Sequence, residues 1–155
     1  AGLGDNVLRR RGSAYSLCLE GAALDVAEFD SAVRAAARSL ALGDEREALE
    51  AYLTALDVYQ DELLGEVGPA EWVVAERERL RVVAANAAYS AAHLSLLHRP
   101  PAEALPLAQR ATVLDPLRDS AWALLAETQE LMGDLGSAAA TRREHTLVSA
   151  ELTAP

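Results

Sequence analysis

Histidine and serine are the side chains of this 155-residue chain best suited to metal binding or nucleophilic catalysis, and their spacing favours neither. His93 and His98 stand five positions apart, whereas two ligands share one helical face when they are four apart. His145 has no second ligand nearby in the sequence and is expected at the surface. Ser90 and Ser95 lack the strand-turn-helix context of a nucleophile elbow, and no phosphate-binding glycine motif occurs. The residues predict no enzyme, no metal site and no cofactor.

Arginine is the other residue type that could make specific contacts, and three of its side chains are consecutive. Arg9, Arg10 and Arg11 form the densest positive cluster of the chain. In an exposed turn they could contact DNA phosphates or a minor groove, although arginines in such a turn are also ordinary solvated surface. The net charge of −10 opposes binding to a phosphate backbone, because that binding depends on basic side chains displacing counterions. We expect the bulk of the chain not to bind DNA.

A break in the helical pattern brings together a further group of candidates. The sequence L-L-G-E-V-G-P-A-E-W covers residues 63–72, and its glycines and proline end one helix and begin another. Trp72 could be an interface anchor, since tryptophan is enriched at binding hot spots, but a tryptophan one turn into an amphipathic helix more often belongs to the core. We expect Trp72 to pack against Leu63 and Leu64 as a structural corner that redirects the helices.

The helix that follows this corner carries a candidate partner surface. Glu76, Arg77 and Arg79 are expected on its outer face, where another protein could contact them. Glu76 and Arg79 lie one turn apart, so an ion pair between them is worth only about a few tenths of a kcal/mol. These charges are therefore more useful for recognition than for stability.

Composition and periodicity predict a mostly α-helical chain behind these candidates. Ala and Leu dominate the apolar residues, and aromatic residues make up only 5%. Before residue 20, Tyr15, Leu17 and Leu19 alternate with smaller residues after a Gly-Ser turn, which predicts a short β-hairpin. Cys18 is the lone cysteine, and we expect it to be a buried small hydrophobic residue. No disulfide can form within the chain, and this lack of disulfides fits a reducing cytoplasm.

Capping residues and apolar stripes predict the helix boundaries. The first helix is expected from its N-cap Asp25 to about Leu42, where Gly43 stops it. Asp44 caps the second helix. That helix carries one apolar stripe at i, i+4, i+7, i+8 and i+11, formed by Ala48, Tyr52, Ala55, Leu56 and Tyr59.

A long helix is expected next, from about Pro69 to Leu97. Its middle, A-A-N-A-A-Y-S-A-A-H, is unusually small, so neighbouring helices can approach closely along it. Arg99-Pro100-Pro101 ends it. Because a proline inside a helix costs about 3 kcal/mol, Pro106 predicts that the following helix begins late or bends there.

Turn residues predict two more helices at the carboxyl end. Asp115-Pro116 closes one helix and starts the next, which ends at Met132-Gly133. Asp134 caps the last helix, which is expected to continue to about Glu151. No run of about 18 apolar residues occurs, so no membrane span is expected.

Small residues recur with the period of a helical repeat. Tetratricopeptide units are helix-turn-helix repeats of about 34 residues that bury their core by stacking. Ala104 and Ala138 are 34 positions apart, whereas Ala48 and Ala104 are 56 apart, so the first junction carries an insertion of about 22 residues. Alanine-rich helical hairpins of other kinds can mimic this spacing. We predict an all-α fold of stacked, tetratricopeptide-like helical hairpins.

Several motifs resemble one known family, in the order in which that family carries them. They are A-L-x-V-Y-x-x-E-L-L from Ala55, E-W-x-x-x-E-R-x-R-L from Glu71 and D-P-L-R-D from Asp115, with G-x-A-Y-S-L from Gly12 and L-D-V-A-E-F from Leu24. The chain resembles the bacterial transcriptional activation domain of SARP-type (antibiotic regulatory protein) transcription regulators, which is tetratricopeptide-like. The block around Trp72 is the most specific motif, because generic tetratricopeptide arrays have no such insert.

The resemblance implies a domain organisation and a function. Residues 1–20 would be the terminal hairpin, or wing, of a winged-helix DNA-binding domain, and residues 21–155 the helical activation domain. The chain would self-associate and contact the transcription machinery, such as RNA polymerase, or neighbouring domains in the cytoplasm, with DNA bound only through a winged helix that is largely absent here. The alternative is a regulatory or scaffold helical-repeat domain of a multidomain signalling ATPase, and a complete winged helix upstream would separate the two.

Overall fold

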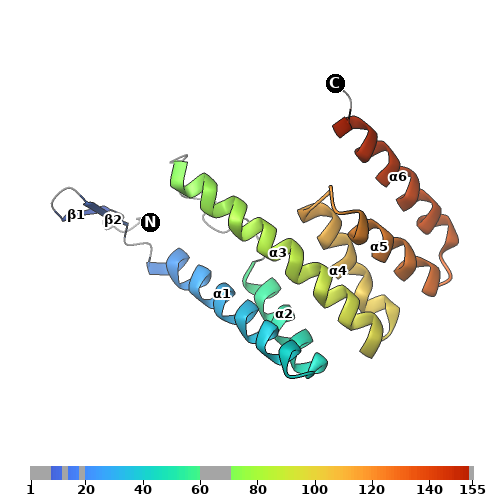
Figure 1. The fold of residues 1–155 in the computed structure, drawn as a ribbon, viewed down its shortest axis with the longest axis horizontal. Helices are drawn as coiled ribbons and strands as arrows, with labels where there is room; N and C mark the ends of the chain where they lie inside the picture. Colours follow the sequence, from blue (N-terminus) through green and yellow to red (C-terminus); the bar gives the residue numbers. More distant parts are fainter. Residues whose placement is uncertain (1–7, 12–13, 18–19, 60–70, 154–155) are drawn as a thin grey trace, which may run out of the picture.

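The computed structural model of the chain describes residues 8–11, 14–17, 20–59 and 71–153, with side chains described over 25–59 and 73–151. Within these ranges two short strands, β1 (Leu8–Arg11) and β2 (Ala14–Leu17), precede six helices: α1 (Glu20–Ala41), α2 (Glu45–Val58), α3 (Glu71–His98), α4 (Pro101–Leu114), α5 (Asp119–Leu131) and α6 (Leu135–Thr153). Each helix packs against the next in sequence, and α3 also contacts α5 (Figure 1). The helices form a stacked array, as the periodicity predicts.

The strands β1 and β2 pair antiparallel, with Leu8 opposite Leu17 and Arg11 opposite Ala14. They occupy the segment in which the sequence alternates with a period of two. The expected burial of Cys18 lies outside the described residues. The pairing does not identify the strands as part of a DNA-binding domain, so that interpretation stays a prediction.

The turn between α1 and α2 forms where the sequence predicts it, whereas the start of α1 lies upstream of its predicted position. Gly43 adopts a φ of 79°, the left-handed conformation that ends a helix and that glycine reaches without strain. The Asp44 carboxylate then accepts a hydrogen bond from the Glu47 backbone N–H at 3.0 Å and caps α2. The expected cap at Asp25 is wrong, because α1 already begins at Glu20. The alanine- and leucine-rich residues before Asp25 favour helix and carry α1 upstream.

Alanine lines the packed interior of the array. The predicted stripe on α2 is buried along its whole length, with Ala48 and Ala55 fully inaccessible. The small middle of α3 is likewise inaccessible to within 2%, at Ala84, Ala85, Ala87, Ala88, Ala91 and Ala92. Because these side chains end at Cβ, α2 and α4 can lie close to α3 on both sides. The prediction that small residues allow close helix approach is confirmed.

Two boundaries near α4 differ from the expectation. The helix begins at Pro101, so the expected late start is wrong, and Pro106 lies inside the helix. Pro101 at the first position loses no hydrogen bond, and the fully buried Ala104 and Ala108 give α4 packing that offsets the backbone bond lost at Pro106. The next helix, α5, begins at Asp119 and not directly after Pro116, because the chain makes a turn there.

The last two helices meet at a turn that repeats the one between α1 and α2. Gly133 has a φ of 80°, and the Asp134 carboxylate accepts a hydrogen bond from the Ser137 backbone N–H at 2.9 Å. The predicted stop at Met132-Gly133 and the predicted cap of α6 are thus confirmed. The recurrence of this turn is local evidence for a repeating helical hairpin.

Candidate functional site

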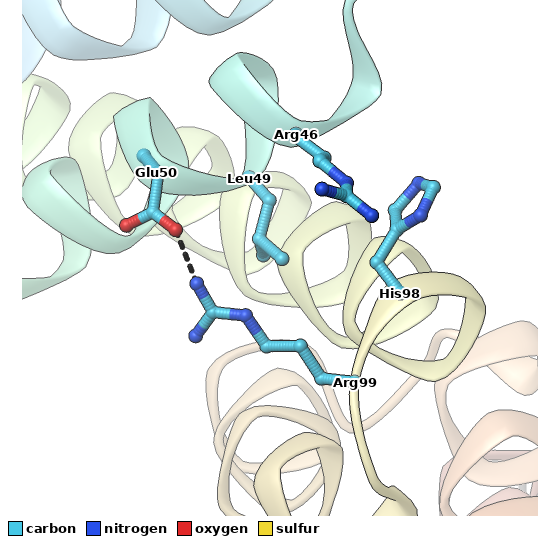
Figure 2. Close-up of a pocket in the computed structure, with 5 residues that line it drawn as sticks. All are labelled: Arg46, Leu49, Glu50, His98 and Arg99. Atoms are coloured by element: carbon cyan, nitrogen blue, oxygen red, sulfur yellow. Dashed lines mark hydrogen bonds and ion pairs between the residues drawn. The ribbon is translucent and has the colours of Figure 1, made fainter.

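A hollow lies where the first turn of α2 meets the last turn of α3. It has a volume of about 280 Å³ and is lined by Arg46, Leu49, Glu50, His98 and Arg99 (Figure 2). A second hollow of about 470 Å³ shares Arg46 and His98 and extends along the turn before α2 past Leu42 and Glu45. Because they share Arg46 and His98, we call the two hollows together the α2–α3 trough. It is open to solvent and mixes charged side chains with an apolar lip.

Two capping signals in the sequence build this trough. Because Asp44 starts α2, Arg46, Leu49 and Glu50 fall at i, i+3 and i+4 and share one helical face. Because the prolines after Arg99 end α3, His98 and Arg99 stand at its last turn and reach toward α2. The trough therefore depends on where two helices end.

Most charges in the trough are matched within the chain, and one is not. The His98 Nε2 lies 2.7 Å from a Glu45 carboxylate oxygen. The Arg99 guanidinium donates to Glu50 and, at 3.2 Å, to Glu103. Arg46 is exposed and makes no hydrogen bond or ion pair in the described part of the chain. Figure 2 shows its guanidinium beside the His98 ring, on the side of the trough away from Arg99.

The predicted partner surface on α3 takes part in a contact between helices. The Arg79 guanidinium donates to Glu76 at 2.8 Å and to Asp30 of α1 at 3.2 Å. The hydrogen bond from Arg79 lowers the pKa of the Glu76 carboxyl, and the same bond, followed by the one to Asp30, raises the pKa of Arg79. Arg77 is half-buried. The Glu76–Arg79 pair was predictable from its spacing, whereas Asp30 was not, because it belongs to another helix.

Other predicted site residues lie wholly or partly outside the described residues. Leu63 and Leu64 are outside them, and for Trp72 only its place in the first turn of α3 is described. Arg9, Arg10 and Arg11 lie on β1 opposite Ser16, Tyr15 and Ala14, without described side chains. The structural corner and the DNA contact therefore remain predictions.

Two arginines that sequence reasoning missed bind the carboxyl ends of helices. Arg110 of α4 donates to the backbone carbonyl of Tyr59, the residue that caps α2, and Arg81 of α3 donates to the carbonyl of Leu114 at the end of α4. The last carbonyls of a helix have no N–H partner that follows the usual helical pattern, so side-chain donors can satisfy them. Burial lowers the pKa of Arg110. No local pattern marks these residues, because the partners are separated by 51 and 33 positions.

Aromatic stacking links the carboxyl-terminal helices. His145 of α6 stacks on Trp122 of α5 with ring centroids 5.6 Å apart, and its Nε2 lies 2.9 Å from Asp119. The side chain is 28% exposed, so the expected surface histidine is partly covered by these two contacts. The guanidinium of Arg118, the residue before α5, lies 4.0 Å from the ring centroid of Tyr89 on α3. This cation–π contact ties the start of α5 to α3. The His145 and Arg118 side chains thus hold neighbouring helices together.

The described residues hold neither a metal-binding cluster nor a membrane-spanning helix. There, no three or more His, Cys, Asp or Glu side chains come together in a group that could hold a metal ion. Likewise, no helix in the described ranges has both the length and the apolar character needed to cross a lipid bilayer.

The sequence matches a known protein family. No curated protein shows significant similarity to the chain. The family model of the bacterial transcriptional activator domain matches residues 24–151, which hold nearly all of α1 to α6. That family is regulatory and is not a catalytic one. The match covers well over half of the chain, which therefore belongs to the bacterial transcriptional activator domain family.

Proposed function

We propose that the chain is the protein-interaction part of a cytoplasmic bacterial transcription regulator, through which the regulator self-associates and contacts the transcription machinery or its own neighbouring domains. The family match over residues 24–151 carries this proposal. The stacked helices support it, because such arrays present extended surfaces to other proteins. No comparison supports the alternative of a scaffold domain in a signalling ATPase.

The edge of the array at which paired helices turn is well suited to protein contacts. The turns α1–α2, α3–α4 and α5–α6 lie along the same edge in Figure 1. Each exposes apolar side chains: Leu42 is 85% exposed, Leu97 57% and Leu135 67%. Single exposed leucines are common on protein surfaces, but their recurrence at successive turns of one edge favours a contact surface. We call these three turns the turn edge.

The amino-terminal residues complete the proposal. We assign residues 1–20 to the terminal hairpin of a winged-helix domain and residues 21–155 to the activation domain. In the intact regulator Arg9 to Arg11 would contact DNA phosphates. Leu63, Leu64 and Trp72 would form the corner before α3, with Glu76, Arg77 and Arg79 beside it as a second partner surface.

Light scattering combined with a polymerase pull-down tests the proposed function. The folded chain should show a mass above that of a monomer as its concentration rises, and should retain bacterial RNA polymerase. The double variant Leu42→Asp/Leu135→Asp changes only exposed residues of the turn edge, so it should keep the helical content and lose retention. A folded chain that stays monomeric and retains no polymerase would refute the proposal.

A further inference from the structure

The last helix, α6, depends on a single neighbour. It lies at one end of the array, and α5 is the one described element against which it packs closely (Figure 1). Of the α6 side chains that the structure describes, Ala138 and Thr141 are the buried ones, whereas the shorter α2 buries Leu49, Tyr52 and Leu56. Elements with few buried apolar contacts open at a lower free energy than the core. The helix α6 can therefore leave α5 while the other helices stay packed.

Specific side-chain contacts decide which helix fits on α5. The Thr141 hydroxyl donates to the side-chain carbonyl of Gln129 at 2.8 Å, in a buried position. Arg142 pairs with Glu130 at 2.7 Å, and one turn further along α6 His145 stacks on a ring of α5. A buried polar group left without its partner is costly, so a replacement helix needs the same hydroxyl, cation and ring at i, i+1 and i+4. The α6 of a second copy presents these groups at this spacing.

The turn that joins α5 to α6 exposes apolar side chains that a second copy can cover. Leu131 is 58% exposed, Met132 45% and Leu135 67%. Gly133 in the middle of the turn has a φ of 80°, which residues other than glycine rarely adopt, and an extended hinge releases it from this conformation. Where two copies exchange α6 symmetrically, their extended hinges approach each other. The exposed apolar side chains can then pack against their counterparts.

We propose that two copies of the chain exchange α6, with the turn at residues 132–134 as the hinge, so that the α6 of each copy lies on the α5 of the other. This inference rests on the self-association in the proposed function and names its surfaces. The contacts between α5 and α6 are the same within one copy and in the exchanged pair. The exchanged pair therefore gains at the hinge, and its population rises with concentration.

Charge reversal across the α5–α6 ion pair tests the exchange. Glu130→Arg sets two guanidinium groups against each other within its own chain, and Arg142→Glu sets two carboxylates against each other. When the two variants are refolded together from urea, exchange of α6 between unlike chains restores opposite charges at both contacts. Native mass spectrometry should therefore show dimers of unlike chains above the share expected from random pairing. A share at or below random pairing would overturn the exchange.

An ion pair between interior elements provides the matched control. Arg99, which follows α3, donates to Glu50 of α2. Glu50→Arg mixed with Arg99→Glu makes the same charge changes at a contact that lies away from α6. This mixture should pair at random, because α2 packs between α1 and α3 and is not exchanged. An equal excess of unlike dimers in the control would show that surface charge and not helix exchange selects the partner.

A substitution at the hinge tests the exchange independently of charge. Gly133→Ala disfavours the closed turn, whose φ is positive, and should raise the dimer fraction in sedimentation velocity above that of the wild type. Gly43→Ala is the control, because Gly43 has a φ of 79° in the turn before α2. A Cβ added at either glycine meets no atom within 4 Å, so both substitutions act on the backbone alone. Equal dimer fractions for the two variants would contradict a hinge at residues 132–134.

The outcomes separate this inference from the proposed function. Dimers that form but pair unlike chains at random would overturn the exchange and leave self-association standing. A wild-type chain that is monomeric throughout would also overturn the exchange, while retention of polymerase by that monomer would leave the proposed function standing. Far-ultraviolet circular dichroism and melting curves establish that every variant is folded.

Discussion

Alanine is the residue type on which the contacts between these helices depend. Ala88 and Ala91 of α3 and Ala111 of α4 are fully inaccessible and belong to one packed cluster with Leu49 and Leu56 of α2. A side chain that ends at Cβ leaves no room for additional atoms once the facing helix has closed on it. Stability at these positions should therefore fall when the side chain grows, although burial of more apolar surface would by itself be favourable.

Ala88→Leu should lower the free energy of unfolding by about 1 to 3 kcal/mol, because the added methyl groups displace α2 or α4. Urea unfolding followed by circular dichroism measures this change. Ala37→Leu provides the matched control, since Ala37 is exposed on α1 and leucine is a good helix former. Equal midpoints for the two variants would show that α3 is not tightly packed at Ala88.

The cap of α6 should make stability depend on pH in the acidic range. The hydroxyl and the backbone N–H of Ser137 both donate to Asp134 and lower the pKa of its carboxyl. Because this pKa is lowered in the folded chain, the ionised Asp134 carboxylate stabilises the fold fully above the pKa of the unfolded chain, about 4. That stabilisation is lost as the pH falls through the pKa of the folded chain. Asp134→Asn can still accept the backbone hydrogen bond but cannot ionise.

Urea midpoints of the wild type and Asp134→Asn, measured from pH 7 to pH 2, test this dependence. The difference between them should be constant at neutral pH and should shrink below about pH 4, where Asp134 becomes protonated. A difference that persists unchanged to pH 2 would mean that the ionised carboxylate contributes nothing to the cap.

The ends of the helices decide how the elements of this fold are joined. Glycine and aspartate make the turns before α2 and α6, whereas Arg110 and Arg81 satisfy carbonyls at the ends of α2 and α4. The turns are local, and the arginine contacts connect segments far apart in sequence. Of these helices, α2 has a turn at its start and an arginine contact at its end, whereas α6 has the turn and α4 the arginine contact.

Arg110→Met should destabilise the chain by about 1.5 to 3 kcal/mol, because it keeps the apolar stem and leaves the Tyr59 carbonyl without its charged donor. Thermal unfolding by calorimetry measures the loss. Arg143→Met is the control, since Arg143 is exposed on α6 and has no ion pair in the part of the chain that the structure describes. If both variants melt together, the capping role of Arg110 is wrong.

Local sequence patterns predicted the elements better than the contacts between them. Gly43-Asp44 and Gly133-Asp134 were recognisable because a helix stop and an N-cap are made by neighbouring residues. The start of α1 was misplaced because residues before Asp25 favour helix without a distinctive cap. The Asp30–Arg79 contact and the trough between Arg46 and His98 could not be predicted, because each joins different helices whose relative placement no local pattern encodes.

At the scale of the whole molecule, the chain is a stacked helical domain of a transcriptional activator family, and we propose that it works through its surface. Its charge of −10 opposes direct binding to nucleic acid, and its exposed apolar residues recur along the turn edge. Both features favour protein partners. The activity assigned to this family should therefore reside in the helical part and be independent of the way in which the protein reaches DNA.

Tethering the chain to an unrelated DNA-binding domain upstream of a weak bacterial promoter tests this claim most directly. The account predicts that the fusion raises reporter transcription above the level given by the DNA-binding domain alone, and that Leu42→Asp/Leu135→Asp abolishes the increase while the fusion still occupies its operator. A folded fusion that occupies the operator and leaves transcription unchanged would contradict the account.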